Sequence, residues 1–290
     1  MTTDDATRAD VTEQVLAGLR GTADPRLREL LTGLVRHLHD FARETRLTRE
    51  EWEKAIAFLT ATGRMCTDTR QEFILLSDVL GLSMLVETLN GERATGATES
   101  TVLGPFHMTE SPVRALGDDI DLAGGGEKCV VSGRVRSADG TPLPGAVVDV
   151  WQADDKGFYD VQQPGVQPPG NGRGLFTADA EGRFWFRTCV PAAYPIPTDG
   201  PVGELLRATG RHPYRPAHIH FIATAEGHTP VTTHIFVAGG DYLDSDAVFA
   251  VKRSLIQDFA ETDDASSARE FGVENPFRHA RFDLVLEPAV

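Results

Sequence analysis

The chain is poor in cysteine, in basic residues and in long apolar runs, and each shortage excludes a class of protein. Only three of the 290 residues are cysteine, and no CxxC spacing occurs. Neither a disulfide framework nor a thiolate zinc site is therefore expected. Lysine and arginine number 28 against 43 acidic residues, and the net charge of −15 argues against the basic surface that nucleic acids require. Without about 18 consecutive apolar residues, no membrane span is predicted.

The first residues, "MTTDDATRADVTEQ", are acidic and polar. A secretory signal needs a basic start followed by an apolar segment, and neither is present. Together with the three cysteines, this predicts a reduced protein of the cytoplasm.

The first third of the chain has the periodicity of helices. In residues 24–44, apolar side chains recur every three or four positions. Asp24 is placed to cap this helix and Pro25 to open it. In residues 47–59, Thr48 and Glu51 have the spacing of a capping box. Two helices are predicted here.

Residues 69–91 predict a third helix, with Thr69 and Glu72 as its capping pair and Asn-Gly as its end. Apolar residues occupy most of its circumference. We expect this helix to be buried or to be covered by another chain.

Beyond residue 95 the pattern changes to short β-branched runs separated by Gly- and Pro-rich turns. The runs are 128–137, 146–153, 182–190, 216–224, 231–239 and 280–288. They predict an antiparallel sandwich or barrel, with one late helix at 245–261. The long segment 158–180 is predicted to be a functional loop. The expected fold is thus α+β, mainly β: a helical domain at 1–95 and a β-sandwich at 96–290.

The stretch "YRPAHIHF" places His218 and His220 two residues apart in a predicted strand, so that both imidazoles project from one face. A single strand histidine is more often a structural residue than a ligand, but the pair makes a metal site about equally plausible. Among the four tyrosines, Tyr159 and Tyr194 lie in loops at strand ends. Phenolate is a hard oxygen donor that suits a trivalent cation such as Fe(III) better than zinc.

The ordered motifs "GFYD", "VPAAYP" and "RPAHIHF" resemble those of the intradiol ring-cleaving dioxygenases, and the resemblance covers nearly the whole chain. It implies one Fe(III) per subunit, held in the β-sandwich by Tyr159, Tyr194, His218 and His220. It also implies a homodimer formed through the N-terminal helices, in some relatives with a phospholipid between them. The implied activity is the cleavage of a catechol-type diol by O2.

The resemblance also assigns roles to residues near these ligands. Tyr194 would be the displaceable ligand that takes a proton from the diol, and Arg215 would stabilise negative charge on the attacked ring carbon. A surface salt bridge is the alternative for Arg215. His234 stands where relatives often carry glutamine, and we expect it to hydrogen-bond the substrate or a ligand without becoming a fifth ligand.

The segments "YPIPTDGPVGELL" and "THIFVAG" are most similar to the branch of this family that cleaves hydroxyquinol, 1,2,4-trihydroxybenzene. A catechol or chlorocatechol 1,2-dioxygenase is the alternative within the family. The substrate contacts implied by the branch are Leu75, Asp78, Val102, Gly104, Pro105, Phe106, Ile196, Pro197, Arg215, His234 and Val251.

Asp78 has two explanations of equal weight. Its carboxylate would be costly in an apolar helix unless it had a partner, and a third substrate hydroxyl could be that partner. A backbone NH or a nearby arginine could equally hold it. Two rival functions for the whole chain also stay open. One is a β-sandwich binding module with structural histidines, and the other is a zinc hydrolase.

Overall fold

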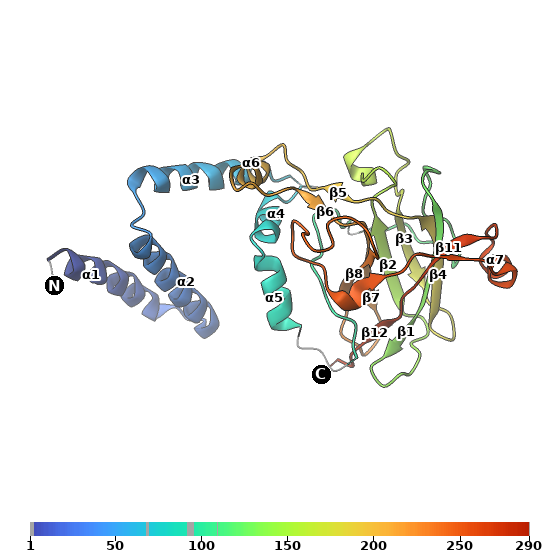
Figure 1. Cartoon of the computed structure of the whole chain (residues 1–290). Helices are drawn as coiled ribbons and strands as arrows, with labels where there is room; N and C mark the ends of the chain where they lie inside the picture. The colour runs from blue at the N-terminus through green and yellow to red at the C-terminus, as the bar shows by residue number, and fades with distance from the viewer. Residues whose placement is uncertain (1–2, 68–69, 92–95, 109, 290) are drawn as a thin grey trace. The chain divides into compact units, whose positions relative to one another are not determined.

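A computed structural model describes residues 3–67, 70–91, 96–108 and 110–289 of the chain (Figure 1). The chain divides into two compact units, Met1–Ala61 and Thr62–Val290. In the parts described, no helix is both long and apolar enough to cross a membrane. The predicted domain boundary near residue 95 stays a prediction, and two helices that precede it belong to the second unit.

The first unit is helical. It contains α1 (Thr3–Gly18), the short 3-10 helix η1 (Leu19–Gly21), α2 (Pro25–Glu44) and most of α3 (Arg49–Arg64). Both predicted caps are confirmed: the Asp24 carboxylate accepts from the backbone NH groups of Arg26 and Leu27. At the start of α3, Thr48 and Glu51 bond each other reciprocally. These helices begin where local capping chemistry predicts.

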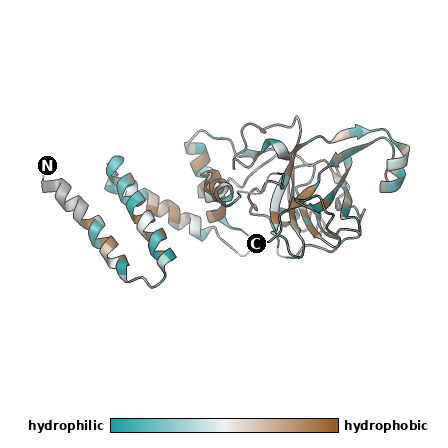
Figure 2. Cartoon of the chain, turned by 90° about the horizontal axis from the view of Figure 1, so that it is seen from below, coloured by the Kyte–Doolittle hydropathy of each residue, from teal (hydrophilic) through white to brown (hydrophobic). Residues whose placement is uncertain are grey.

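Eight large apolar side chains of α2 and α3 are exposed in the single chain, each by 44% or more. In Figure 2, apolar and polar segments alternate along these helices. The exposed apolar residues are Leu27, Leu30, Leu34, Leu38, Phe41, Trp52, Ile56 and Leu59.

The third predicted helix is in fact two helices, α4 (Glu72–Val79) and α5 (Leu82–Asn90). The prediction of one helix was wrong because Gly81 has a left-handed backbone with φ of +74°, which glycine adopts without steric cost and which ends a helix. Thr69 lies outside the described residues. Glu72 accepts from Arg70 and from the backbone NH of Val202. Of the apolar residues of the two helices, Leu75, Val79 and Met84 are buried.

The β-strands form two five-stranded sheets in the described part of the second unit. In the first sheet, β1 is central and pairs with β4, β11 and β12, while β10 pairs with β11. The second sheet has the order β3-β2-β7-β8-β9. The strands of the first sheet are β1 (Lys128–Ser137), β4 (Arg183–Cys189), β10 (Ala260–Thr262), β11 (Phe277–Arg281) and β12 (Leu284–Leu286). Those of the second are β2 (Val147–Gln152), β3 (Arg173–Thr177), β7 (His218–Thr224), β8 (Val231–Val237) and β9 (Ile256–Gln257).

The sheets pack face to face, as the sandwich prediction requires. Phe184 and Phe186 on β4 contact Phe221 on β7, with ring centroids 6.3 and 6.4 Å apart. The expectation of antiparallel pairing holds for most pairs, but β1 is parallel to β11 and β12, and β8 is parallel to β9. The segments before β9, β11 and β12 return the chain to the end of the sheet where the paired strand begins, so these strands run parallel to it. The pattern of short apolar runs does not predict this direction.

Successive side chains of β7 point alternately into the apolar core and toward the site. Ile219, Phe221 and Ala223 belong to the apolar core between the sheets. The side chains between them, including His220, therefore project from the outer face of the second sheet. A short ladder of β5 (Tyr194–Pro195) and β6 (Tyr214–Arg215) lies next to β7 in the sequence.

The predicted helix at 245–261 was wrong. This segment contains turns, the 3-10 helix η3 (Arg253–Leu255) and the strand β9, with β10 beginning at its end. The Asp246 carboxylate accepts from the backbone NH groups of Val248 and Ala250, and Phe249 has φ of +61°. These contacts bind the backbone donors in a turn, where a helix would need them for its own carbonyls.

The segment 158–180 is only partly a loop. It contains the 3-10 helix η2 (Asp160–Gln162) and the strand β3, which the turn residues hid from prediction. Three helices were not predicted: α1, α6 (Pro201–Ala208) and α7 (Ala265–Phe271). The last two are short, at eight and seven residues, and too few turns repeat to show a period.

Candidate metal centre and active site

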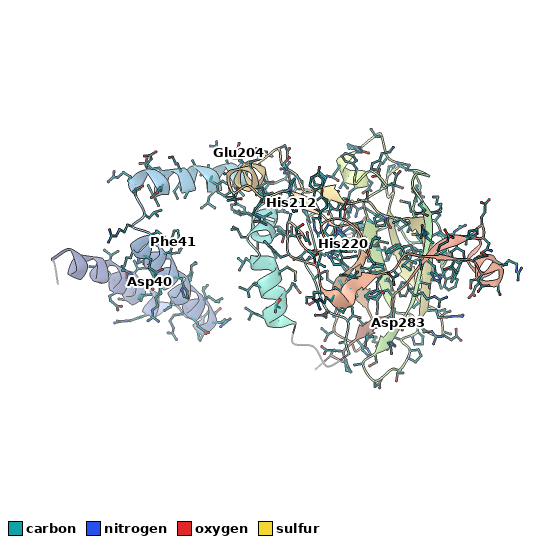
Figure 3. All side chains as sticks on the ribbon, viewed as in Figure 1. Asp40, Phe41, Glu204, His212, His220 and Asp283 are labelled. Carbon is teal, nitrogen blue, oxygen red and sulfur yellow. The ribbon has the colours of Figure 1, made fainter. Side chains whose placement is uncertain are left out.

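The histidine pair lies on β7 with its ring nitrogens together. The Nε2 atoms of His218 and His220 are 3.1 Å apart, and both side chains are buried. Figure 3 labels His220 among the side chains of the second unit. Burial lowers the pKa of each imidazole well below its ordinary value, so both are neutral. The carbonyl oxygen of Pro216, 2.7 Å from Nδ1 of His218, can only accept a hydrogen bond. The proton of His218 is therefore on Nδ1, and its Nε2 carries the lone pair that accepts.

Two phenols meet this pair. Tyr159 precedes η2, and Tyr194 begins β5. Their Oη atoms are 3.4 Å apart, and Oη of Tyr159 is 3.1 Å from Nε2 of His220. Burial raises the pKa of both phenols, while the charge of Arg215 opposes the rise. Two oxygen and two nitrogen donors from three segments of the chain thus converge in one buried place.

The donor set fits a metal cation. The two Nε2 atoms face each other at 3.1 Å, an arrangement in which both neutral imidazoles can bind one cation. A cation would also offset the cost of burying two phenol oxygens as phenolates. Hard phenolate oxygens with imidazole nitrogens favour a trivalent transition metal over zinc, whose protein ligands are mainly thiolate, imidazole and carboxylate.

His234 is close to this set but faces its other side. His218, His220 and His234 each have a ring nitrogen within 4.8 Å of the others. However, Nε2 of His234 is 2.6 Å from Nδ1 of His220, on the ring edge away from Nε2. His234 is thus a hydrogen-bond partner of His220, and the two residues are register partners across β7 and β8. Its own Nδ1 is buried without a hydrogen-bond partner among the described protein atoms.

Arg215 is buried beside the pair. Its Nη1 donates to Nε2 of His218 at 3.1 Å, and its Nε donates to Asp246 at 3.1 Å. The guanidinium is therefore held as a cation in a dry place, next to the convergent donors. The ion pair of Arg215 with Asp246 is not a surface salt bridge, because both side chains are only 2% exposed.

Asp78 is buried in α4, with only 2% of its surface exposed. Its Oδ1 has no hydrogen-bond partner in the described part of the protein. Burial raises the pKa of this carboxyl, while Ser83 and the charge of Arg215 oppose the rise. A buried carboxyl with a free oxygen is ready to bond a further polar group.

Aromatic rings and one glycine enclose the donors. Trp151 on β2 stacks on His220 with ring centroids 4.5 Å apart, and Phe106 stacks on Tyr159 at 4.6 Å. Gly104 has φ of +78°, and a Cβ there would lie 3.0 Å from Cε1 of His220. Only glycine allows this close approach of the backbone.

Five of the predicted substrate contacts line one cavity of about 480 Å³: Leu75, Pro105, Phe106, Ile196 and Pro197. Arg70, Glu72 and Asp199 form its polar side. Val251 lines a different cavity, of about 540 Å³, together with Asp246. Val102 and Gly104 are buried and line neither cavity.

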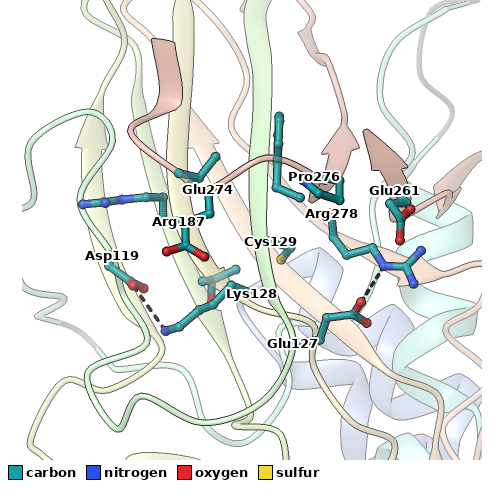
Figure 4. A pocket seen from close by; sticks show the side chains of 12 residues that line it. Asp119, Glu127, Lys128, Cys129, Arg187, Glu261, Glu274, Pro276 and Arg278 are labelled. Carbon is teal, nitrogen blue, oxygen red and sulfur yellow. Dashed lines mark hydrogen bonds and ion pairs between the residues drawn. The ribbon is translucent and has the colours of Figure 1, made fainter. Parts of the chain in front are cut away.

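A third cavity, of about 390 Å³, lies on the first sheet and contains no predicted site residue (Figure 4). Cys129 lies among its lining residues, and Lys128 and Arg278 are ion-paired there with Asp119 and Glu127.

Sequence reasoning missed two residues at the site. Trp151 looked like an ordinary strand residue, although it is one of only three tryptophans. Asp246 was assigned to a helix face. Its position two residues after Asp244, in a run rich in Asp and Ser, is a turn signal that could have identified it.

Fold and site together define a β-sandwich enzyme with a buried cluster of tyrosine and histidine donors. Two family models match the chain, "Dioxygenase" over residues 104–288 and "Catechol dioxygenase N terminus" over residues 24–98. The chain belongs to the intradiol dioxygenase family.

Curated and solved relatives agree with this assignment. A hydroxyquinol 1,2-dioxygenase of Rhizobium sp. (strain MTP-10005) is 54% identical over 91% of this chain and 89% of that protein. A 6-chlorohydroxyquinol 1,2-dioxygenase of Cupriavidus pinatubonensis is 55% identical over 92% and 97%. The crystal structure of hydroxyquinol 1,2-dioxygenase from Pseudomonas putida DLL-E4 matches with a TM-score of 0.90 and 45% identity, over 98% of this chain and all of that one.

Proposed function

We propose that the enzyme cleaves hydroxyquinol with O2, between the carbons that bear its adjacent hydroxyls, to 3-hydroxy-cis,cis-muconate, the enol form of maleylacetate. Both oxygen atoms of O2 enter the product, so no further reductant is needed. Relatives with 54% and 48% identity are named for this reaction. The observation that carries the proposal is the convergence of Tyr159, Tyr194, His218 and His220.

These four residues would hold one ferric ion per subunit. When bound, the ion would supply a Lewis acid that chelates the deprotonated diol and draws electron density from it. Two anionic phenolates and two neutral imidazoles give a ligand set that favours the ferric state. Tyr159 is stacked under Phe106, which supports its role as the ligand that stays in place.

Tyr194 would take one proton from the diol at its Oη. It lies at the start of a two-residue strand, next to Tyr159 and His218. Arg215, fixed by Asp246, would lie beside the ring and stabilise the negative charge that develops on the attacked carbon. His234 would accept a hydrogen bond from Nδ1 of His220, which leaves Nε2 of His220 free for the metal.

Asp78 would recognise the third hydroxyl of the substrate. Its Oδ1 is buried and unpaired, and a site built to bond a hydroxyl discriminates against an analogue that lacks it. Of the remaining predicted contacts, Leu75, Pro105, Phe106, Ile196 and Pro197 would form the apolar walls around the ring, while Val102, Gly104 and Val251 stay predictions.

The exposed apolar residues of α2 and α3 support a homodimer through the N-terminal helices. A phospholipid between those helices is a further part of the proposal, because an apolar groove between two copies would accept acyl chains. Three free cysteines agree with a location in the reducing cytoplasm.

The first experiment is a visible absorption spectrum of the purified enzyme, before and after hydroxyquinol is added without oxygen. Phenolate-to-Fe(III) charge transfer should colour the protein red-brown, and the bound substrate should move the band to longer wavelength. Protein that stays colourless after ferric iron is supplied would contradict the proposal and favour a binding module. Zinc content without iron would instead favour a hydrolase.

The substrate is tested by comparing kcat/KM for hydroxyquinol, catechol and chlorocatechols. We expect hydroxyquinol to be preferred, and Asp78→Ala to reduce this preference by raising catechol turnover relative to hydroxyquinol turnover. A wild-type preference for catechol, or an unchanged ratio in Asp78→Ala, would reassign the substrate while leaving the ferric site intact.

A further inference from the structure

A second buried ion pair lies behind the donor cluster, and the proposed reaction uses neither of its members. Nε of Arg173 donates to Oδ1 of Asp160 at 2.8 Å. The two side chains are only 2% and 7% exposed. An ion pair buried this deeply costs desolvation energy and is weak evidence for stability alone. Its position next to a metal ligand suggests another reason for its presence.

Asp160 directly follows Tyr159 and fixes the backbone on both sides of the loop. Its Oδ2 accepts from the backbone NH of Gly170 at 3.0 Å. The backbone NH of Tyr159 donates to the side chain of Gln162 at 2.9 Å. Arg173 is the first residue of β3, so its bond to Asp160 connects this strand to the turn that carries Tyr159.

Arg173 is also connected to His220, through Trp151. In the register of the second sheet, Arg173 is the partner of Trp151, and Trp151 is the partner of His220. The rings of Trp151 and His220 are stacked with an interplanar angle of 14°. His220 in turn contacts Oη of Tyr159. Backbone pairing and these side-chain contacts together form a closed circuit, in which Arg173 connects the loop residue Tyr159 to the strand residue His220.

Most of the hydrogen-bonding capacity of Arg173 is unused. Its Nη1 and Nη2 atoms are buried and have no partner among the described protein atoms. Buried donors without acceptors are costly, so they are retained where they serve a purpose. The positive charge of Arg173 lies within electrostatic range of both Tyr159 and His220.

We propose that Arg173 is a positioning residue of the ferric centre, which holds Tyr159 in ligand geometry through Asp160 and places a fixed positive charge behind its phenolate oxygen. This inference rests on the proposed function, because it assigns a role toward the iron. Arg173 does not touch the substrate in this proposal. It acts on the strength and the electronic properties of the tyrosine–iron bond.

The test compares Arg173→Met, Arg173→Lys and Asp160→Asn with the wild-type enzyme. Iron per subunit, ferric affinity in competition with nitrilotriacetate, and the position of the charge-transfer band are measured for each. The thermal midpoint of every iron-free protein is measured in parallel. Arg187→Lys and Asp121→Asn are matched controls, because Arg187 on β4 donates to the backbone carbonyls of Gly117 and Gly272, and Asp121 is a buried partner of Lys128.

We expect Arg173→Met and Asp160→Asn to weaken ferric affinity by roughly 10- to 100-fold, the usual effect of removing a group that orients a ligand, and to shift the band. Arg173→Lys keeps the charge but not the planar fork, so its values should lie between those of the wild type and Arg173→Met. The controls should keep wild-type iron affinity and colour.

A purely structural ion pair gives a different result. In that case the variants lower the thermal midpoint of the iron-free protein, but the folded protein keeps wild-type iron affinity and band position, and the proposal is overturned. If Arg173→Met does not fold, the iron affinity and the band position of Arg173→Lys distinguish a positioning role from a purely structural one. A wild-type enzyme that binds no iron would refute the proposed function itself, which is a separate outcome.

Discussion

The two compact units of this chain differ in which side chains they expose and which they bury. In the helices of the first unit, large apolar side chains such as Leu34 and Phe41 are more than half exposed. In the second unit, charged and polar side chains such as Arg173, Arg215 and His234 are 2% exposed or less. An exposed apolar stripe indicates a surface that another molecule covers, whereas buried ionisable groups indicate chemistry. Apolar side chains are exposed on α5 of the second unit as well, so the contrast is between the exposed apolar stripe of the first unit and the buried ionisable groups of the site.

The costs of the two arrangements also differ. An uncovered leucine costs little beyond the burial energy that it forgoes. A buried guanidinium or imidazole must be held by specific partners, and the site supplies them: Asp246 for Arg215, Asp160 for Arg173, and His220 for His234. We therefore expect changes in the second unit to affect turnover, and changes in the first unit to affect association.

The largest expected effect is at Arg215. Arg215→Ala should lower kcat by about 10²- to 10³-fold, as expected when a preorganised charge stabiliser is removed. The iron content and colour should stay, because Arg215 is not a proposed ligand. Steady-state kinetics with an iron assay checks both statements. Wild-type turnover in this variant would show that the buried cation has no role in the reaction.

The second prediction concerns the apolar stripe. The double substitution Leu34→Glu and Leu38→Glu should weaken self-association by about 10²-fold or more, because each buried leucine contributes roughly 1.5 kcal/mol or more. Sedimentation measures the association, and kcat per subunit should change little. Arg36→Glu, on the opposite face of α2, is the matched control. A double variant that stays dimeric would place the dimer contact elsewhere.

The third prediction tests a buried polar group of the second unit that lies far from the site in its contacts. His279 bonds Ser132 at 2.8 Å, and burial, aided by the charge of Arg281, lowers the pKa of His279 to about 4. Below the ordinary pKa of about 6.5, the unfolded chain binds a proton that the folded chain does not. The free energy of unfolding should therefore fall between pH 6.5 and pH 4, by roughly 3 kcal/mol in total. Denaturant titrations across this range should show a weaker pH dependence in His279→Gln, and an identical dependence would refute the assignment.

The smallest effect is expected at the polar side of the cavity. Arg70 binds Asp199 with two hydrogen bonds of 2.9 Å and also bonds the buried Glu72. Asp199→Ala removes only the outer contact, so KM should change by less than about fivefold, within the 1 kcal/mol typical of exposed pairs. Glu226→Ala, an exposed acidic residue in another loop, controls for net charge. A large loss of kcat with unchanged KM would assign Asp199 a role in the reaction.

Helix starts and strand faces could be predicted from the sequence, because residues close together in the chain determine them. Asp24 and Thr48 start helices because their side chains bond backbone groups three residues away or fewer. His218 and His220 share a face because strands alternate. These predictions need no information from distant residues.

Predictions failed where a distant partner competes with local preference. The helical pattern at 245–261 gave way to turns because Asp246 is bound by Arg215, which lies 31 residues earlier. The apolar run at 69–91 broke at Gly81, a residue that fits either a helix interior or its end. The strand β3 was hidden because it pairs with β2, more than twenty positions back.

The sequence by itself determined the family, through ordered motifs that resemble its members, and it named Tyr159, Tyr194, His218 and His220 as the proposed donors, because those motifs are short stretches of neighbouring residues. Only the tertiary structure decided what surrounds them. The stacking of Trp151, the closure by Gly104, the anchoring of Arg215 by Asp246 and the link from Arg173 to Tyr159 all join segments far apart in the chain. Such contacts depend on strand register and loop path, which short-range sequence patterns do not encode.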